Sequence, residues 1–230
     1  MRVLLIQNCE VEGFGLYGEI LADRGVAHDL VHAWRGDMLP LPGEHAAILV
    51  GGTPVSAADA GRHDHLRAVL RFLESTIAAK RPCLGICGGG QILARALGAD
   101  VHRNRTTEIG GYDIRLTSDG REDPVFAGFP ADFPVFHWHA DTFDVPAGAT
   151  LLAIGGTCRN QAFRHGNAVA VQFHLEVTAA EADRWAMAYP SDLKDLGKTR
   201  GDVISECKRR EPAMSELADR LVTNVLEMVG

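Results

Sequence analysis

The stretch Arg81-Pro-Cys-Leu-Gly-Ile-Cys-Gly-Gly-Gly-Gln91 is an apolar run that breaks into glycines and then takes on a helical pattern. A strand that turns sharply into a helix needs a backbone that bends and neighbours that approach closely, and residues without a Cβ allow both. Such a turn would place the Cys87 thiol at the N-terminus of the helix, where the helix field favours a thiolate. We therefore predict that Cys87 is a nucleophile and that Cys83, inside the strand, is a buried structural cysteine.

A second apolar run, Val171-Gln-Phe-His-Leu-Glu176, ends in a histidine and a carboxylate. Residues two apart on an extended strand face the same way, so we expect Glu176 to orient the His174 imidazole. A histidine held in this way can take the proton of the Cys87 thiol. A His-x-Glu pattern is common by chance and gains its weight from the turn at Cys87. Together the three residues indicate acyl transfer through a thioester.

In the first half of the chain, apolar runs of strand length alternate with helical periodicity. This alternation is typical of βαβ units and of an α/β fold with a mainly parallel sheet flanked by helices. The expected strands are Val3–Gln7, Ala27–His32, Ala46–Val50 and Cys83–Ile86, and the expected helices are Tyr17–Arg24, His65–Ala79 and Gln91–Ala96.

From about Thr107 the pattern changes to strands joined by turns, which indicates a more antiparallel segment that returns to the central sheet. The expected strands here are Ile109–Thr117, Val135–Trp138, Thr150–Ile154, Gln161–Arg164 and Ala168–Phe173. At the end of the chain, apolar residues at helical spacing predict a helix over 214–229 that begins near Pro212. We expect a single domain over 1–230, with a core of 1–178 and a helical tail of 179–230. The tail helix would pack on the core, and docking of a partner is the alternative.

Length and composition fit an ordinary globular protein. A chain of 230 residues has room for one sizeable α/β domain. The net charge of −7 argues against a nucleic-acid surface. No stretch approaches the roughly 18–20 apolar residues that span a membrane, and the first apolar run is too short for a signal peptide. The five cysteines, an odd number without a C-x-x-C pair, indicate free thiols and a cytoplasmic location.

Two glycine patterns could suggest a bound nucleotide. Gly13-Phe-Gly-Leu-Tyr-Gly18 matches G-x-G-x-x-G, but Glu10 and Glu12 separate it from the first strand, and His32 stands where an acid is needed. The glycines at 88–90 have no Lys-Ser/Thr after them, so they form no phosphate loop. We interpret the first pattern as a loop that leads into a helix.

Two His-x-His pairs could suggest a metal. His63 and His65 lie at an expected helix start, where residues two apart diverge. His137 and His139 share a strand face, but no third ligand is visible in the sequence. We expect no metal and no cofactor.

Taken together, the motifs resemble the class I, or triad, glutamine amidotransferases, above all the stand-alone GMP-synthase-like group. The nucleophile motif of this family reads Gly-(Ile/Val)-Cys-x-Gly-x-Gln and matches residues 85–91, while its His-Pro-Glu motif corresponds to His174-Leu-Glu176. The turn Gly51-Gly-Thr-Pro54 resembles the oxyanion loop of the family. The resemblance covers about residues 1–178 and implies a flavodoxin-like fold with the site at the carboxyl ends of the strands.

The resemblance also implies substrate contacts. The N–H groups of Gly52 and Gly88 would form the oxyanion hole, and Gln91 would contact the substrate. The segment His137-Trp-His-Ala-Asp-Thr-Phe143 resembles the one that holds the amino-acid head of the substrate, which implicates Ala140 and Asp141. The family usually has glycine at the position of Ala140 and a bulky residue at that of Gly88.

The implied reaction is hydrolysis of the side-chain amide of L-glutamine, which yields glutamate and ammonia. The sequence carries no Ser-Gly-Gly-x-Asp-Ser-type ATP-pyrophosphatase loop, and a separate synthetase subunit is one candidate to receive the ammonia. One alternative is a γ-glutamyl hydrolase or peptidase that uses the same triad on a γ-glutamyl compound. Another is a non-catalytic binding module, because a fold does not determine a function.

Overall fold

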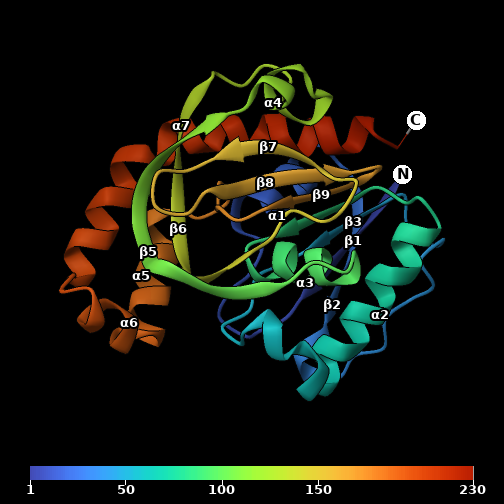
Figure 1. Ribbon diagram of the computed structural model, residues 1–230, viewed down its shortest axis with the longest axis horizontal. Helices are drawn as coiled ribbons and strands as arrows, with labels where there is room; N and C mark the ends of the chain where they lie inside the picture. The colour runs from blue at the N-terminus through green and yellow to red at the C-terminus, as the bar shows by residue number, and fades with distance from the viewer. Residues whose placement is uncertain (230) are drawn as a thin grey trace.

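The computed structural model describes residues 1–229, and nine strands of this range form one mixed sheet in the order β2-β1-β3-β4-β9-β8-β7-β5-β6 (Figure 1). The parallel half consists of β2 (Ala27–His32), β1 (Arg2–Gln7), β3 (Ala47–Val50), β4 (Cys83–Ile86) and β9 (Ala168–Val171). The antiparallel half consists of β8 (Asn160–His165), β7 (Thr150–Ile154), β5 (Val101–Leu116) and β6 (Asp132–Phe143). The predicted α/β class, with a parallel centre and an antiparallel segment, is confirmed.

Helices cover both faces of this sheet. They are α1 (Gly15–Asp23), α2 (Asp64–Ala78), α3 (Gly88–Ala96), α4 (Ser118–Glu122), α5 (Ala179–Ala188), α6 (Pro190–Asp195) and α7 (Arg200–Glu227). Three short 3-10 turns, Ala33–Arg35, Ala57–Arg62 and Pro124–Phe126, join the larger elements. None of the helices within residues 1–229 is both long and apolar enough to cross a membrane.

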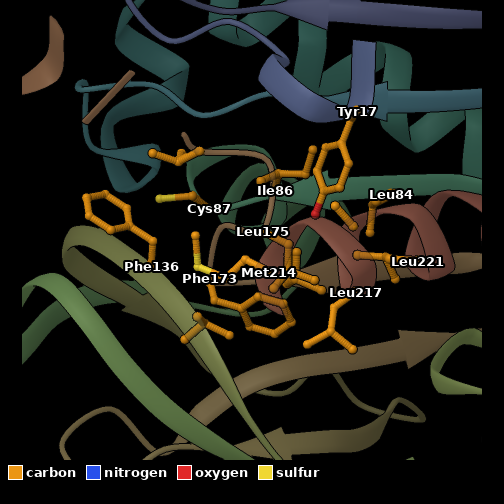
Figure 2. Close-up of a cluster of buried hydrophobic side chains, with 14 of the residues drawn as sticks. Tyr17, Leu84, Ile86, Cys87, Phe136, Phe173, Leu175, Met214, Leu217 and Leu221 are labelled. Atoms are coloured by element: carbon orange, nitrogen blue, oxygen red, sulfur yellow. The ribbon is translucent and has the colours of Figure 1, made fainter. Parts of the chain in front are cut away.

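The alternation of side chains along β1 divides the apolar core into two layers, because successive residues of a strand point to opposite faces. Leu4 and Ile6 pack with the residues of α2 and α3, whereas Val3 and Leu5 pack with those of α1 and α7. Figure 2 shows part of the second layer, where Tyr17 of α1 approaches the sheet near the helix that carries the buried Leu217. The two layers hold the carboxyl ends of β3, β4 and β9 side by side.

Three predicted strands have the wrong bounds, and one of them, expected at Val135–Trp138, is only the middle of β6 (Asp132–Phe143). The strand expected at Ile109–Thr117 is only the second half of β5, which begins at Val101 and runs antiparallel to β6 with an irregularity between Arg103 and Glu108. Its first half is polar and partly exposed, so it lacks the apolar alternation that identifies a strand. The strand expected to reach Phe173 ends at Val171, because its neighbour β4 has by then turned into α3 and offers no further backbone partners.

The final helix is much longer than predicted. α7 starts at Arg200, and Pro212 lies inside it rather than near its start. Thr199 and Asp202 begin the helix with a reciprocal capping box, which satisfies its first free N–H groups. An interior proline costs about 3 kcal/mol or more. Packing of α7 against α5, β5 and β6 offsets this cost.

Candidate active site

Cys87 occupies a strained turn between β4 and α3. Its φ of +51° lies in a region that residues with side chains rarely adopt, which is typical of a nucleophile held at the tip of a strand. A Cβ at Gly89 would lie 2.1 Å from the carbonyl oxygen of Val50, and one at Gly88 would lie 2.7 Å from the backbone nitrogen of Thr53. Thr53 therefore occupies the space into which a side chain at position 88 would extend.

The imidazole of His174 is held by the carboxylate of Glu176. Its Nδ1 lies 2.5 Å from Oε1 of Glu176, whose Oε2 accepts the backbone N–H of Leu175 at 3.1 Å. Both side chains are buried. Backbone hydrogen bonds in both directions with Phe136, at 2.8 and 3.0 Å, fix the backbone of His174 beyond the end of β9. The predicted pairing of base and carboxylate is therefore present, although on a bridge rather than on a continuous strand.

The pKa of His174 depends on the neighbouring Cys87 thiol. Burial alone lowers the pKa of His174, but the Glu176 carboxylate and the neighbouring Cys87 sulfur raise it well above its usual value. Within residues 1–229, Nε2 of His174 is buried and has no hydrogen-bond partner, so it is available to receive a proton. Cys83 differs, because burial raises its pKa to about 12 and leaves it inert, as predicted.

Two polar groups contact the sulfur of Cys87. The amide Nε2 of Gln172 donates to Sγ at 3.5 Å, and the thiol lies 3.7 Å from the carbonyl oxygen of Trp138. An N–H group aimed at the sulfur stabilises negative charge there. Gln172 directly follows β9, so the strand that leads to His174 also supplies a partner for the nucleophile.

The glycine pattern at 13–18 packs against the backbone of Glu176. The backbone N–H of Leu16 donates to the carbonyl oxygen of Glu176 at 3.0 Å. A Cβ at Gly15 would lie 2.3 Å from the same oxygen, so only glycine lets the start of α1 approach this closely. The glycines therefore belong to a loop that leads into α1, as predicted from the sequence.

A cavity of about 390 Å³ opens beside Cys87. Its lining includes five of the predicted site residues, namely Cys87, Gly88, Gln91, Ala140 and Asp141. Gly52 is buried beside the nucleophile, since a Cβ on it would lie 3.9 Å from the Cβ of Cys87. Five predicted residues, distant in sequence, therefore come together around one space, whereas Gly52, His174 and Glu176 lie outside its lining.

The predicted substrate contacts are bonded to one another. Nε2 of Gln91 donates to the carbonyl oxygen of Asp141 at 3.0 Å and to Oε1 of Gln172 at 3.1 Å. The carboxylate of Asp141 accepts a hydrogen bond from the hydroxyl of Ser56, and Arg103 lies 4.0 Å from it. These bonds fix the strand segment that borders the cavity.

Sequence reasoning missed Glu12. This carboxylate lines the cavity, and Tyr189 donates a hydrogen bond to it at 3.2 Å. Burial raises the pKa of Glu12, while the charge of His174 opposes the rise. An acid between the first strand and the glycines was visible in the sequence, but nothing in the pattern connected it to Cys87.

The tail also contributes to the site. Tyr189, Asp192, Asp195 and Leu196 line the cavity, although the predicted core ends at 178. The indole Nε1 of Trp138 donates to the carboxylate of Asp192 at 3.0 Å, which ties α6 to the cavity wall. The short polar α6 carries no motif, so sequence reasoning left the role of this region open.

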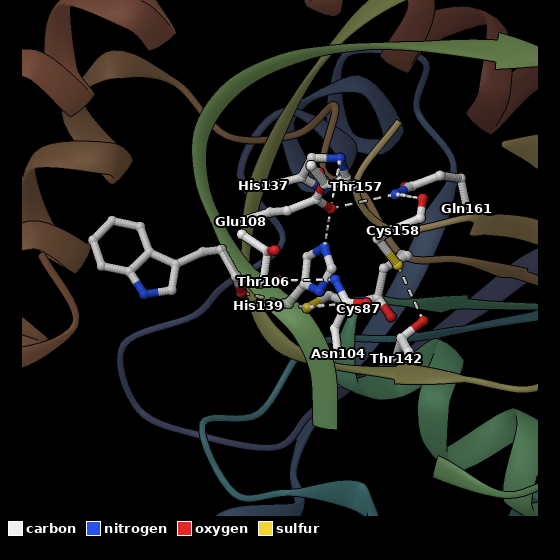
Figure 3. A network of polar contacts seen from close by, with 12 residues as sticks. Cys87, Asn104, Thr106, Glu108, His137, His139, Thr142, Thr157, Cys158 and Gln161 are labelled. Atoms are coloured by element: carbon white, nitrogen blue, oxygen red, sulfur yellow. Dashed lines mark hydrogen bonds and ion pairs between the residues drawn. The ribbon is translucent and has the colours of Figure 1, made fainter. Parts of the chain in front are cut away.

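One cluster within residues 1–229 has the composition of a metal site. Glu108, His137 and His139 are all buried, and their ligand atoms lie within 4.8 Å of one another (Figure 3). The third ligand was missed because Glu108 lies far from the histidines in sequence and faces them only through the pairing of β5 with β6.

The known proteins that this chain resembles are glutamine amidotransferases and related proteins. Residues 32–188 match the family described as glutamine amidotransferase class-I. The chain is 31% identical over 200 residues to the glutamine amidotransferase-like protein YfeJ of Salmonella typhimurium, covering 85% of this chain and 84% of that protein. The crystal structure of a glutamine amidotransferase from Thermotoga maritima superposes with a TM-score of 0.91 at 32% identity, covering 99% of this chain and 98% of that one.

GMP synthases are further relatives. The chain is 30% identical over 151 residues to a glutamine-hydrolyzing GMP synthase subunit of Thermoplasma acidophilum, covering 64% of this chain and 71% of that relative. It is 26% identical over 216 residues to the GMP synthase of Pyrobaculum aerophilum, covering 92% of this chain but only 39% of that synthase. The family match spans the turn at Cys87 as well as His174 and Glu176, and the chain belongs to the class I glutamine amidotransferases.

Proposed function

We propose that the chain hydrolyses the side-chain amide of L-glutamine through a γ-glutamyl thioester on Cys87. The thiol gives its proton to His174, and the sulfur attacks the amide carbon. His174 then passes the proton to the departing ammonia. Water attacks the thioester with His174 as general base, which releases glutamate and restores the thiol. Glu176 keeps the imidazole oriented throughout.

One observation supports this proposal most strongly. The buried His174–Glu176 pair, 2.5 Å between Nδ1 and Oε1, lies beside a cysteine whose backbone is held at a φ of +51°. Burying an imidazole and a carboxylate is expensive unless the two are paired, and strain of this kind is maintained at functional sites. Structural packing alone would require neither feature.

The surrounding residues have matching roles in the proposal. The N–H groups of Gly52 and Gly88 bind the oxyanion, since the loop after β3 packs directly on the nucleophile turn. Gln91, Ala140 and Asp141 border the space for the amino-acid head of the substrate. The carboxylate of Asp141 suits an α-ammonium group.

A γ-glutamyl compound with a larger leaving group is the second candidate substrate. Besides Cys87, the cavity is lined by Trp138 and by three residues of the tail, Tyr189, Asp192 and Asp195. Its volume of about 390 Å³ falls in the range of roughly 300–1,000 Å³ that is usual for pockets holding small molecules. This space gives a leaving group larger than ammonia a place to sit.

A synthetase partner follows from the glutaminase proposal. The relative from Thermoplasma acidophilum is named as one subunit of GMP synthase, and we propose that this chain likewise supplies ammonia to a separate synthetase protein. The odd number of cysteines supports a reducing, cytoplasmic location. The isolated chain would turn over glutamine weakly, and a docked partner would raise kcat/KM at least tenfold, about 1.4 kcal/mol of transition-state stabilisation.

A substrate screen tests the proposal. Purified wild type and Cys87→Ser are assayed for glutamate release from L-glutamine, γ-glutamyl amides and γ-glutamyl peptides, with and without cell extract. Glutamine turnover that the extract stimulates supports the amidotransferase, and at least tenfold preference for a larger leaving group supports the second candidate. If Cys87→Ser kept both activities, both candidate functions would be contradicted.

A further inference from the structure

The cluster of Glu108, His137 and His139 brings three ligand atoms to one point. Nε2 of His139 lies 2.9 Å from Oε2 of Glu108, and Nε2 of His137 lies 3.7 Å from the same oxygen. The side chains are 2% exposed or less. Glu108 pairs directly with His139 across β5 and β6, and His137 is two residues further along the same strand face.

The hydrogen bonds of His139 require a cation within the cluster. Its Nδ1 lies 2.9 Å from the carbonyl oxygen of Asp141, which can only accept, so Nδ1 carries a hydrogen. In a neutral ring, Nε2 then presents a lone pair to Oε2 of Glu108, which is also an acceptor. Two lone pairs at 2.9 Å need either a shared proton or a metal ion between them.

The environment of His137 favours the metal ion over the proton. Among residues 1–229, neither ring nitrogen of His137 has a hydrogen-bond partner, although the residue is fully buried. Burying unpaired polar atoms is costly. A proton shared by His139 and Glu108 leaves both nitrogens of His137 unsatisfied, whereas an ion at the cluster satisfies Nε2.

We propose that Glu108, His137 and His139 bind one divalent transition-metal ion, with zinc as the ion that best suits two imidazoles and a carboxylate. Zinc takes nitrogen and oxygen ligands at about 2.0–2.2 Å, and three protein ligands leave one position for water. Figure 3 shows the cluster next to Cys87, and His139 itself lines the cavity, so the ion would lie close to the predicted triad on the strand pair that borders the cavity.

Two of the three residues, His139 and Glu108, have neighbours of the kind that orient metal ligands, whereas Nδ1 of His137 has no partner within residues 1–229. Ligating histidines usually donate their second ring N–H to a carbonyl or carboxylate, and ligating carboxylates are themselves hydrogen-bonded. Nδ1 of His139 meets the first condition through Asp141. Glu108 meets the second, because it accepts hydrogen bonds from the hydroxyl of Thr157 and from Nε2 of Gln161, the latter at 3.5 Å.

An ion bound to the cluster would fix the position of β6 where this strand borders the cavity. The carbonyl oxygen of Asp141 accepts hydrogen bonds from Nδ1 of His139 and from Nε2 of Gln91. Fixing His139 therefore fixes the segment of β6 that carries Ala140 and Asp141 at the cavity. The role is structural, since the ion supplies no step to the reaction at Cys87.

The test uses the full chain in a Cys87→Ser background, because the thiol and imidazole of the triad could bind zinc themselves. Chelator-stripped protein is titrated calorimetrically with Zn²⁺ and then analysed for bound metal by mass spectrometry. His137→Leu removes a ligand that has no hydrogen bond to lose. His63→Leu, in the partly exposed His-x-His at the start of α2, is the matched control. Glu108→Gln provides a second variant that keeps the shape of the side chain.

We expect about one zinc ion per chain in the parent and in His63→Leu, and at least tenfold weaker binding in His137→Leu and Glu108→Gln. Co²⁺ in the parent should show the visible bands of a nitrogen–oxygen site without a thiolate charge-transfer band. Zinc should raise the Tm of the parent but not that of His137→Leu. Equal binding in the parent and His137→Leu, or no stoichiometric binding in the parent, would overturn the site and leave a proton shared by His139 and Glu108.

Discussion

The backbone N–H of Cys87 donates a hydrogen bond to the carbonyl oxygen of Val171 across 2.8 Å. Because β4 and β9 pair in parallel up to Ile86 and Val171, this bond extends the ladder by one residue onto the turn. It ties the proposed nucleophile to the strand whose continuation carries His174. Residues far apart in the sequence are thus held in one register, and a shift of β9 along β4 would separate thiol from imidazole.

Loss of either triad partner should abolish turnover while the fold survives. Cys87→Ser and His174→Ala should each lose on the order of 10⁴-fold or more in kcat/KM, because the members act as a unit. Glu176→Gln should lose less, roughly 10²–10⁴-fold, because the amide still accepts from Nδ1 of His174. Glutamate release under saturating glutamine measures this, and circular dichroism checks the fold. Turnover within tenfold of wild type in Cys87→Ser would exclude the mechanism.

Gly88→Ala tests the oxyanion loop. A Cβ at this position would lie 2.7 Å from the backbone nitrogen of Thr53, so the loop after β3 must move away from the nucleophile. Displacing one oxyanion donor costs on the order of 10²–10³ in kcat. Gly13→Ala is the control, because a Cβ there meets nothing within 4 Å. A folded Gly88→Ala with full activity would show that the loop is misassigned.

Asp192→Ala should weaken substrate binding more than the chemical step. The variant removes the acceptor of the indole N–H of Trp138, 3.0 Å away, and loosens the wall of the cavity without reaching the thiol. We expect KM to rise about threefold to tenfold. A rise of this size corresponds to the loss of a partly exposed hydrogen bond to a charged group. Lys194→Ala, exposed on the same helix, should leave KM unchanged. A large fall in kcat with KM unchanged would place Asp192 in the chemistry instead.

Glu181→Gln should change how stability depends on pH. Burial raises the pKa of Glu181 from 4.5 to about 6, so between these values the folded chain binds more protons than the unfolded chain. Its contribution to the free energy of unfolding therefore falls as pH rises through this window, by roughly 2 kcal/mol. Glutamine does not titrate and still supports the capping box of α5.

Urea unfolding of wild type and Glu181→Gln at several pH values measures this difference. The variant should gain stability relative to wild type as pH rises from below 4.5 to above 6, whereas Glu74→Gln, on the exposed face of α2, should run parallel to wild type. Parallel curves for wild type and Glu181→Gln would show that Glu181 is not desolvated in the folded state.

Local chemistry made the centre of the fold predictable. Around Cys87, the apolar run, the glycines and the following helix all have short-range causes, and β4 and α3 lie close to where the pattern put them. Runs of strand length between turns or helical segments likewise identified β1, β2 and β7. The pairing of His174 with Glu176 followed from their spacing, although the backbone that carries them is a bridge to Phe136 rather than a strand.

Features that depend on distant partners were not predictable. The first half of β5 is a strand because β6 pairs with it, not because its own residues alternate. Pro212 reads as a helix start in isolation, yet the capping box at Thr199 and packing on the sheet extend the helix through it. Glu12 and Glu108 became visible as parts of sites only when the sheet brought other residues beside them.

Intact-protein mass spectrometry of acid-quenched turnover shows whether a γ-glutamyl thioester forms on Cys87. Wild type mixed with excess L-glutamine, or with a γ-glutamyl compound, should gain the mass of one γ-glutamyl group. Proteolytic fragments should place that group on Cys87, and the adduct should be absent in Cys87→Ser. Steady release of glutamate with no adduct on Cys87, or with the adduct on another residue, would exclude Cys87 as the nucleophile.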